Sequence, residues 1–275
     1  MLGKLIKYDL KSTSKILILV HGFLLLSALF MRLFITGQLQ AESMSEGSEL
    51  LLTLTILLYT LLIMGASFAT SIIIAVRFYK NLFSDEGYLT NTLPVKRGTH
   101  LLAKTISGGI WAVIDLILLF LSIYIVAFPP MVMELYQEHE SEILEALGFT
   151  GAYALPSTPV LLLFLAAVCI LSGLSSVAMI YASIALGQLF ASHRVVGAVA
   201  CYFAISTVFS MISYATTMII GLSTDAFVTT DENTGMNLGR YIFGILEFST
   251  VWAVITGIIL YIVTWRLLDR KLNLP

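Results

Sequence analysis

Two carboxylates lie inside long apolar stretches of this chain, and they are the first candidates for chemistry. Asp115 lies about ten residues into one stretch, roughly 15 Å deep at the rise of a helix, and Glu247 lies closer to one end of another. A charge buried in lipid costs about 2.5–3.5 kcal/mol on insertion scales. Each carboxylate is therefore expected either to bond to neighbouring polar groups or to line a translocation path, and both roles stay open. Gly108, Trp111 and Ser122 share the helix face of Asp115, which predicts that this face looks inward.

Catalytic patterns are weak. A membrane-embedded serine protease of the rhomboid kind needs the pattern G-x-S-G and a histidine on another span. The nearest string, residues 173–176, reads GLSS, and neither His21 nor His193 forms a convincing pair with Ser175. Cys169 and Cys201 fall inside apolar stretches and fit small packing residues better than a disulfide or a metal pair. The sequence therefore predicts no catalytic residue, no bound cofactor and no metal site.

The composition sets the broad class of the protein. Of its 275 residues, 58% are hydrophobic and only 12% are charged, whereas soluble domains carry about 25% charged residues. The net charge of −2 gives no reason to expect a nucleic-acid partner. The chain is expected to be an integral membrane protein surrounded by a lipid bilayer.

Six stretches reach the roughly 20 residues that a membrane-spanning helix needs. They are residues 16–35, 50–76, 105–128, 160–190, 195–222 and 241–265. Helices rather than barrel strands are expected, because barrel strands alternate and run only about ten residues. The predicted fold is all-α and polytopic, with six transmembrane helices in a single domain over residues 1–275 and no linker that divides it.

The basic residues predict the orientation, because Lys and Arg concentrate on the cytoplasmic side. Of the 15 basic residues, all except Arg32 and Arg240 flank one side of the six stretches. The opposite loops are acidic, and Arg32 is expected to reach out to them or to headgroups. Their carboxylates are Glu42, Glu46, Glu49, Glu134, Glu138, Glu140, Glu142, Glu145, Asp225, Asp231 and Glu232. Both termini are therefore predicted to be cytoplasmic, in a plasma-membrane protein.

The first 15 residues are typical of a helix that lies on the membrane surface. Four lysines share one narrow stripe, and apolar residues cover the other side. These expected membrane-surface anchors are Lys4, Lys7, Lys11 and Lys15. Asp9 falls on the apolar side, either as a hydrated flank residue or in contact with a neighbouring subunit or with Arg77.

The longest external loop, residues 129–159, carries five of the glutamates. Residues 131–147 are compatible with a helix, and Gly148 suits its C-terminus. A solvated acidic face is one interpretation, and a gate or collector for cationic cargo is the other.

The segment between the second and third spans, residues 77–104, is the most informative. Ser84 can cap a short helix whose first turn bears Asp85 and Glu86, as the helix dipole favours. Gly87 weakens that helix soon after its start, and Pro94 marks a turn. The expected element presents Phe83, Tyr88 and Leu89 beside charge on the cytoplasmic side, which is what a protein docking surface needs.

This segment resembles the first cytoplasmic loop of six-span ABC exporter permeases of the type 2 class, with the string S-D-E-G-Y-L at residues 84–89 and L-P at 93–94. Residues 7–10 (KYDL) and 272–274 (LNL) are also similar. The resemblance implies an N-terminal elbow helix, two permease copies per transporter and transport driven by ATP. It also implies that a coupling helix docks on a separate ATP-binding subunit. The implied coupling residues are Phe83, Ser84, Asp85, Glu86, Gly87, Tyr88, Leu89, Leu93 and Pro94.

The chain lacks an ATPase motif of its own. No G-x-x-x-x-G-K-[ST] loop occurs, and the string ISGGI at residues 106–110 opens an apolar span rather than a nucleotide-binding fold. ATP and Mg²⁺ are therefore expected in the partner subunit.

Three function classes remain to be compared. The favoured one is the permease subunit of an ATP-driven exporter, with an antimicrobial peptide, a lipid or a drug as cargo. A secondary carrier that uses Asp115 or Glu247 as an ion site is the alternative, although the paired interrupted helices of such carriers are not seen. A membrane-embedded enzyme is the weakest. The sequence decides neither the cargo nor whether the two permeases are identical.

Overall fold

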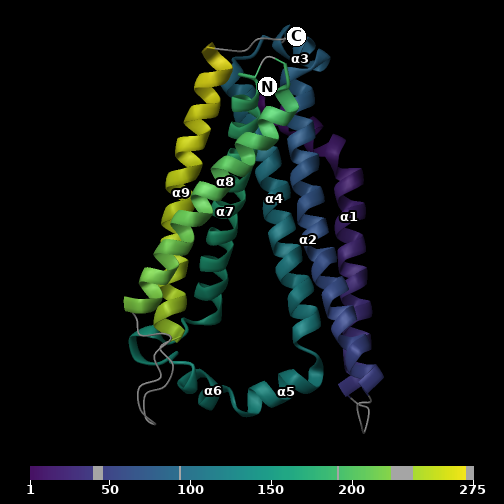
Figure 1. Ribbon diagram of the computed structural model, residues 1–275, viewed down its shortest axis with the longest axis vertical. Coiled ribbons are helices and arrows are strands. Elements are labelled where there is room, and N and C mark those ends of the chain that lie inside the picture. Colours follow the sequence, from purple (N-terminus) through teal and green to yellow (C-terminus); the bar gives the residue numbers. More distant parts are fainter. Residues whose placement is uncertain (40–45, 93, 191, 224–237, 271–275) are drawn as a thin grey trace. The chain divides into compact units, whose positions relative to one another are not determined.

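The computed structural model describes residues 1–39, 46–92, 94–190, 192–223 and 238–270, and every regular element in them is helical (Figure 1). Six helices are long and apolar enough to cross a membrane. They are α1 (Leu2–Leu39), α2 (Glu46–Phe83), α4 (Arg97–Ala127), α7 (Thr158–Gly187), α8 (Arg194–Ser223) and α9 (Leu238–Arg270). The shorter elements are α3 (Asp85–Thr92), α5 (Pro130–Glu138), α6 (Glu140–Ala146) and the 3-10 turn η1 (Gly151–Tyr153). The predicted all-α, multi-pass membrane fold is confirmed.

Contacts divide the chain into two compact units. Unit 1 consists of Met1–Met133 and Leu268–Pro275, and unit 2 of Glu134–Leu267. The boundary falls inside α5. In unit 1, Arg97 donates from its Nη1 atom to the carbonyl oxygens of Leu268 and Asp269, at 3.1 and 3.2 Å. A guanidinium at these carbonyls complements the negative end of the α9 dipole.

Helix α1 is one unbroken helix, so the predicted surface segment and the first span are continuous. The four predicted lysine anchors are all exposed. The opposite face is buried at intervals of three or four residues, which is the period of a helix face. The buried positions are Asp9, Thr13, Leu17, His21, Leu24, Ala28 and Met31. This stripe turns toward α2 and α4.

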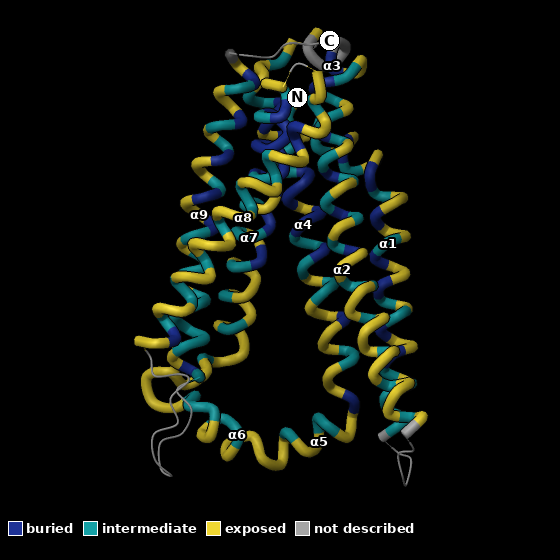
Figure 2. Tube along the Cα trace, in the orientation of Figure 1, coloured by how far each residue is buried: buried dark blue, intermediate teal, exposed yellow. Residues whose placement is uncertain are grey.

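Unit 1 is packed most tightly at what we call its basic end, where α2 ends, α4 begins, and Lys80, Lys96 and Arg97 gather. On α2 the buried residues begin at Ala66 and continue to Phe83, whereas no described side chain from residue 47 to residue 65 is buried. Figure 2 shows the same gradient in the dark-blue segments of α2 and α4. On α2, the buried residues are therefore concentrated in the half that leads to α3.

In unit 2, small residues let the helices approach closely. A Cβ atom built on Gly187 of α7 would lie 2.4 Å from the backbone nitrogen of Ala198 on α8. Helix α9 crosses α7 at Gly257, where a Cβ would lie 3.5 Å from the Cα of Ser175. Such contacts give helix association its van der Waals component in lipid.

The acidic loop differs in part from its prediction. The expected helix over residues 131–147 is split into α5 and α6 at His139. Gly148 does end the second helix, with a left-handed φ of 76° that favours glycine. Its five glutamates are all exposed, which agrees with a solvated acidic face.

The α7–α8 crossing can be tested at Gly187. We expect Gly187→Ala to lower the free energy of unfolding by about 1–3 kcal/mol, because the new methyl group meets backbone that no rotamer change can move. The measurement is the unfolding transition of the purified protein in detergent. Gly65→Ala is the matched control, since nothing lies within 4 Å of its Cβ position and alanine favours the helix by about 1 kcal/mol. Equal stability of the two variants would contradict the close approach.

Candidate functional site

The segment between α2 and α4 folds as a short helix at the basic end of unit 1. Helix α2 continues to Phe83, α3 occupies Asp85–Thr92, and α4 begins at Arg97. The predicted short helix and the turn around Pro94 are thus present. Gly87, which was expected to weaken this helix, is buried, and α3 continues past it to Thr92.

The expected exposure of Phe83 is wrong. Its side chain is only 4% exposed and packs against Phe78, with ring centroids 5.8 Å apart in an edge-to-face arrangement. Its ring also stacks on Tyr79, at 6.3 Å. Packing the Phe83 ring against neighbouring aromatic rings removes apolar surface from water, which favours the buried position over an exposed one. Phe83 therefore holds the end of α2 in place instead of presenting a free ring.

The predicted helix cap at Ser84 also differs. Its hydroxyl donates to the carbonyl oxygen of Lys80 at 2.6 Å and so closes the last turn of α2. Asp85 and Glu86 do lie exposed in the first turn of α3, where the helix dipole favours carboxylates. Leu93 and the side chains of Tyr88 and Leu89 lie outside the described residues, and so does the terminal string at 272–274.

Asp9 is the centre of a charged cluster that joins α1, α2 and α4. The side chain of Asp9 is 11% exposed. One carboxylate oxygen bonds to Lys104 and, at 3.3 Å, to Nε of Arg77, and the other accepts from the Ser107 hydroxyl. Of the interpretations left open for Asp9, the contact with Arg77 is confirmed. A buried carboxylate with two cations and a hydroxyl around it is fully satisfied.

Glu86 extends this cluster to α3. Its carboxylate accepts from the Asn81 amide and lies 3.9 Å from Nη1 of Arg77. Asn81 in turn accepts from the ammonium group of Lys104. The first turn of α3 is thus linked through α2 to α4 and to Asp9 on α1. A cavity of about 150 Å³ is bordered by Asp9, Arg77, Asn81 and Lys104, and the buried His100 forms part of its wall.

A second polar cluster lies deeper in the span and surrounds Asp115. Its Oδ1 atom lies 2.8 Å from Nε2 of His21 on α1 and accepts from the Thr70 hydroxyl of α2 at 2.9 Å. Its Oδ2 atom accepts from the Ser67 hydroxyl at 2.8 Å. The side chains of Asp115 and His21 are 9% and 5% exposed. The imidazole also stacks on Trp111, with 6.4 Å between the ring centroids. The predicted inward face of α4 is confirmed, since Gly108, Trp111 and Ser122 are buried with Asp115.

The hydrogen bonds of His21 define the protons of this pair. Nδ1 lies 2.8 Å from the carbonyl oxygen of Leu17, which can only accept, so Nδ1 carries a proton. One further proton then lies between Nε2 and Oδ1 of Asp115, on either atom. The pair has no net charge in either arrangement. The cluster therefore places one shared proton between the two side chains inside an apolar span, without an unpaired charge.

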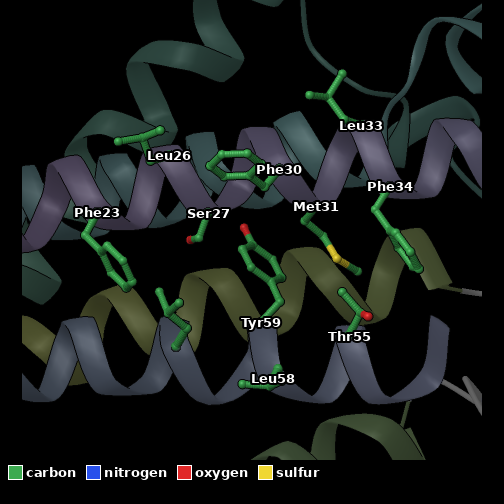
Figure 3. A pocket seen from close by; sticks show the side chains of 11 residues that line it. Phe23, Leu26, Ser27, Phe30, Met31, Leu33, Phe34, Thr55, Leu58 and Tyr59 are labelled. Atoms are coloured by element: carbon green, nitrogen blue, oxygen red, sulfur yellow. The ribbon is translucent and has the colours of Figure 1, made fainter. Parts of the chain in front are cut away.

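Beyond this cluster, α1 and α2 diverge and leave an apolar groove of about 760 Å³ (Figure 3). Phe23, Phe30 and Leu58 are among its walls, and the hydroxyls of Ser27 and Tyr59 lie between the two helices. Its lining contains no carboxylate or basic group.

The two predicted path carboxylates belong to different units. Asp115 is fully bonded within unit 1, which fits the structural role that the sequence left open for it. Glu247 of α9 lies in unit 2 and is exposed. Its use in a translocation path stays a prediction.

Comparison with known proteins gave no match. No protein-family model matches the sequence, and no curated protein or solved structure is similar to it. Arguments about function therefore rest on the residues and the geometry of this chain.

His21 is the functional candidate that sequence reasoning missed. It was compared only with Ser175, as half of a catalytic pair. Counted from the ends of their spans, His21 and Asp115 lie at different depths, about five and ten residues in. The sequence could have predicted this pair from chemistry alone, because ionisable side chains within membrane spans tend to pair with one another.

A double-mutant cycle tests the buried pair. We expect His21→Leu or Asp115→Leu alone to cost about 3–5 kcal/mol of unfolding free energy, because each leaves the other group unpaired in an apolar span. The double variant should cost clearly less than the sum of the two single costs. Unfolding of the purified protein in detergent measures all four free energies. Additive single costs would contradict a direct interaction.

Proposed function

We propose that this protein is the permease subunit of an ATP-driven exporter and works with a separate ATP-binding subunit. The observation that carries the proposal is α3, a short helix with exposed Asp85 and Glu86 between two spans. Charged contacts link its first turn to α1, α2 and α4. A helix in this place can pass a motion of the ATP-binding subunit to the membrane spans. Any displacement of α3 acts on α1, α2 and α4 through Glu86 and the Asp9 cluster.

The mechanism follows from the bonding. Nucleotide binding in the partner subunit displaces α3, and the ion pairs of Arg77 and Lys104 pass this displacement to α1 and α4. Because Asp9 is buried and its partners come from two other helices, these helices move together. ATP and Mg²⁺ belong to the partner, and a second permease copy in the bilayer completes the transporter. Peptides, lipids and drugs are all possible cargo, and neither catalysis nor nucleic acid has a part in this scheme.

A secondary carrier is the second candidate, and the buried His21–Asp115 pair favours it. A site that holds one proton within a span is what proton-driven transport requires. Vesicles that contain this chain alone would then transport in response to an ion gradient, with no dependence on nucleotide. Loss of that transport in Asp115→Asn would assign the proton site.

The docking role of α3 can be tested with Leu89→Asp, after co-expression with an ATPase encoded by a neighbouring reading frame. We expect at least tenfold weaker association of the two subunits, since a new charge disrupts an apolar docking contact. The measurement is co-purification together with ATP hydrolysis in proteoliposomes. Leu135→Asp is the matched control, because this exposed leucine of α5 lies in the acidic loop.

Asp9→Asn separates docking from transmission. The subunits should still co-purify, because Asp9 is buried on α1 and is not part of the exposed surface of α3, while coupling of ATP hydrolysis to transport should fall. Full coupling in Leu89→Asp would overturn the docking role. Full coupling in Asp9→Asn would overturn the transmission path.

The orientation of α3 is a further prediction. With both native cysteines in α7 and α8, Asp85→Cys should react with a membrane-impermeant maleimide only after cells are opened. Glu142→Cys in α6 should react in intact cells. The readout is the labelled fraction of the protein. Labelling of residue 85 from outside would contradict a coupling role for α3.

A further inference from the structure

A hollow lined by hydroxyl groups lies within unit 2, among α7, α8 and α9. Its volume is about 320 Å³. Eight hydroxyl side chains line it, and the other lining residues are Met179, Phe209, Trp252 and Ala253. The hydroxyls belong to Ser172, Ser175, Ser176, Ser206, Ser210, Ser213, Ser249 and Thr256. The lining contains no ionisable group, so the chemistry of the hollow depends on hydroxyls and aromatic rings.

Five of these hydroxyls have already used their hydrogen atom. Ser176, Ser206 and Ser249 each donate to the carbonyl oxygen three residues earlier, at 2.9–3.1 Å. Thr256 donates to the carbonyl oxygen of Trp252 at 2.7 Å, so the 3.2 Å contact between Ser175 and Thr256 has Ser175 as its donor. The oxygen lone pairs of these five groups are what remains for a ligand.

The other three hydroxyls can still act both as hydrogen-bond donors and as acceptors. Ser172, Ser210 and Ser213 make no side-chain hydrogen bond within the described part of the chain. Taken together, the hollow offers many more acceptors than donors. In a membrane span, where water does not compete, a ligand rich in N–H groups and poor in acceptors matches this surface best.

The aromatic residues favour the same class of ligand. Phe209 and Trp252 contact each other edge to face, with centroids 5.6 Å apart, and both border the hollow. The electron-rich faces of such rings attract cations. In the same unit, α6 carries three exposed glutamates, which would raise the local concentration of a cation.

We propose that this hollow binds the ammonium group of a cationic amphiphile through the serine oxygens, with the apolar tail in the surrounding lipid. The inference deepens the proposed function by naming the class of cargo, and it rests on that function for its role in transport. The binding itself needs neither ATP nor a partner. Glu247 takes no part, because it does not line the hollow.

The test uses the full chain in phosphatidylcholine nanodiscs, with Trp111→Phe and Trp265→Phe so that Trp252 is the only tryptophan. Three twelve-carbon probes are titrated while its fluorescence is recorded: dodecylammonium, dodecyltrimethylammonium and dodecanoate. We expect dodecylammonium to bind at least tenfold more tightly than the trimethyl compound, which has the charge but no N–H group. Dodecanoate should not bind.

Two sets of variants locate the site. Ser172→Ala/Ser210→Ala/Ser213→Ala should weaken dodecylammonium at least tenfold, and Ser210→Phe should abolish binding by filling the space. Thr207→Ala/Thr216→Ala is the matched control, since both residues lie on α8 but outside the hollow, and it should bind like the parent protein. A fold check comes from the unfolding transition of each variant.

Several results would overturn the proposal. Equal affinity for the two cationic probes would show that the serine oxygens do not select the N–H groups of the ammonium, and would overturn the proposal. Unchanged binding in the triple serine variant would remove the hollow from consideration. Cross-linking of Ser210→Cys to a second copy would show that packing between copies covers it. Because the assay contains no ATPase, a negative result leaves the exporter proposal standing, and failure of ATP-driven transport leaves this site standing.

Discussion

Unit 1 depends on a single constraint, namely that a carboxylate buried among apolar helices must find its partners on neighbouring helices. Asp9 and Asp115 both lie on buried faces, at 9% and 6% exposure. Each is bonded to side chains from two other helices. An unpaired carboxylate there would cost several kcal/mol, so these bonds set how α1, α2 and α4 are aligned along their axes. Apolar contacts alone would permit many alignments, because leucine packs equally well against lipid and against another helix.

The two polar clusters have different consequences. The cluster around Asp9 reaches α3 through Glu86, so it ties the short helix to the membrane-spanning part. The cluster around Asp115 is closed, because Ser67, Thr70 and His21 satisfy both carboxylate oxygens. The Asp9 cluster, which continues to α3, is suited to transmitting movement. The Asp115 cluster, which makes no such connection, is suited to stabilising the helices or to holding one proton.

The second unit uses little charge in its spans. Its helices approach through Gly187 and Gly257, and the hollow among α7, α8 and α9 is lined by hydroxyls. A serine hydroxyl has a low free-energy cost of burial in lipid, because it can donate a hydrogen bond to a carbonyl oxygen of its own helix. The oxygen atoms that are left over then form an acceptor surface without any buried charge. The two units therefore solve the problem of polar groups in lipid in different ways.

The sequence by itself determined the number of spans, their approximate limits and the short helix before Pro94, because length and hydropathy along a single segment decide these features. It also indicated that Asp115 lies on an inward face, since that depends only on the period of one helix. Only the tertiary structure decided that His21 is the partner of Asp115 and that Asp9 meets Arg77 and Lys104. Each of these depends on the alignment of one helix against another, and such alignment is fixed by contacts between residues that lie 45 or more positions apart. A local pattern in the sequence carries no record of those contacts, and for the same reason the serines of α7, α8 and α9 could not be assigned to one hollow before the helices were placed together.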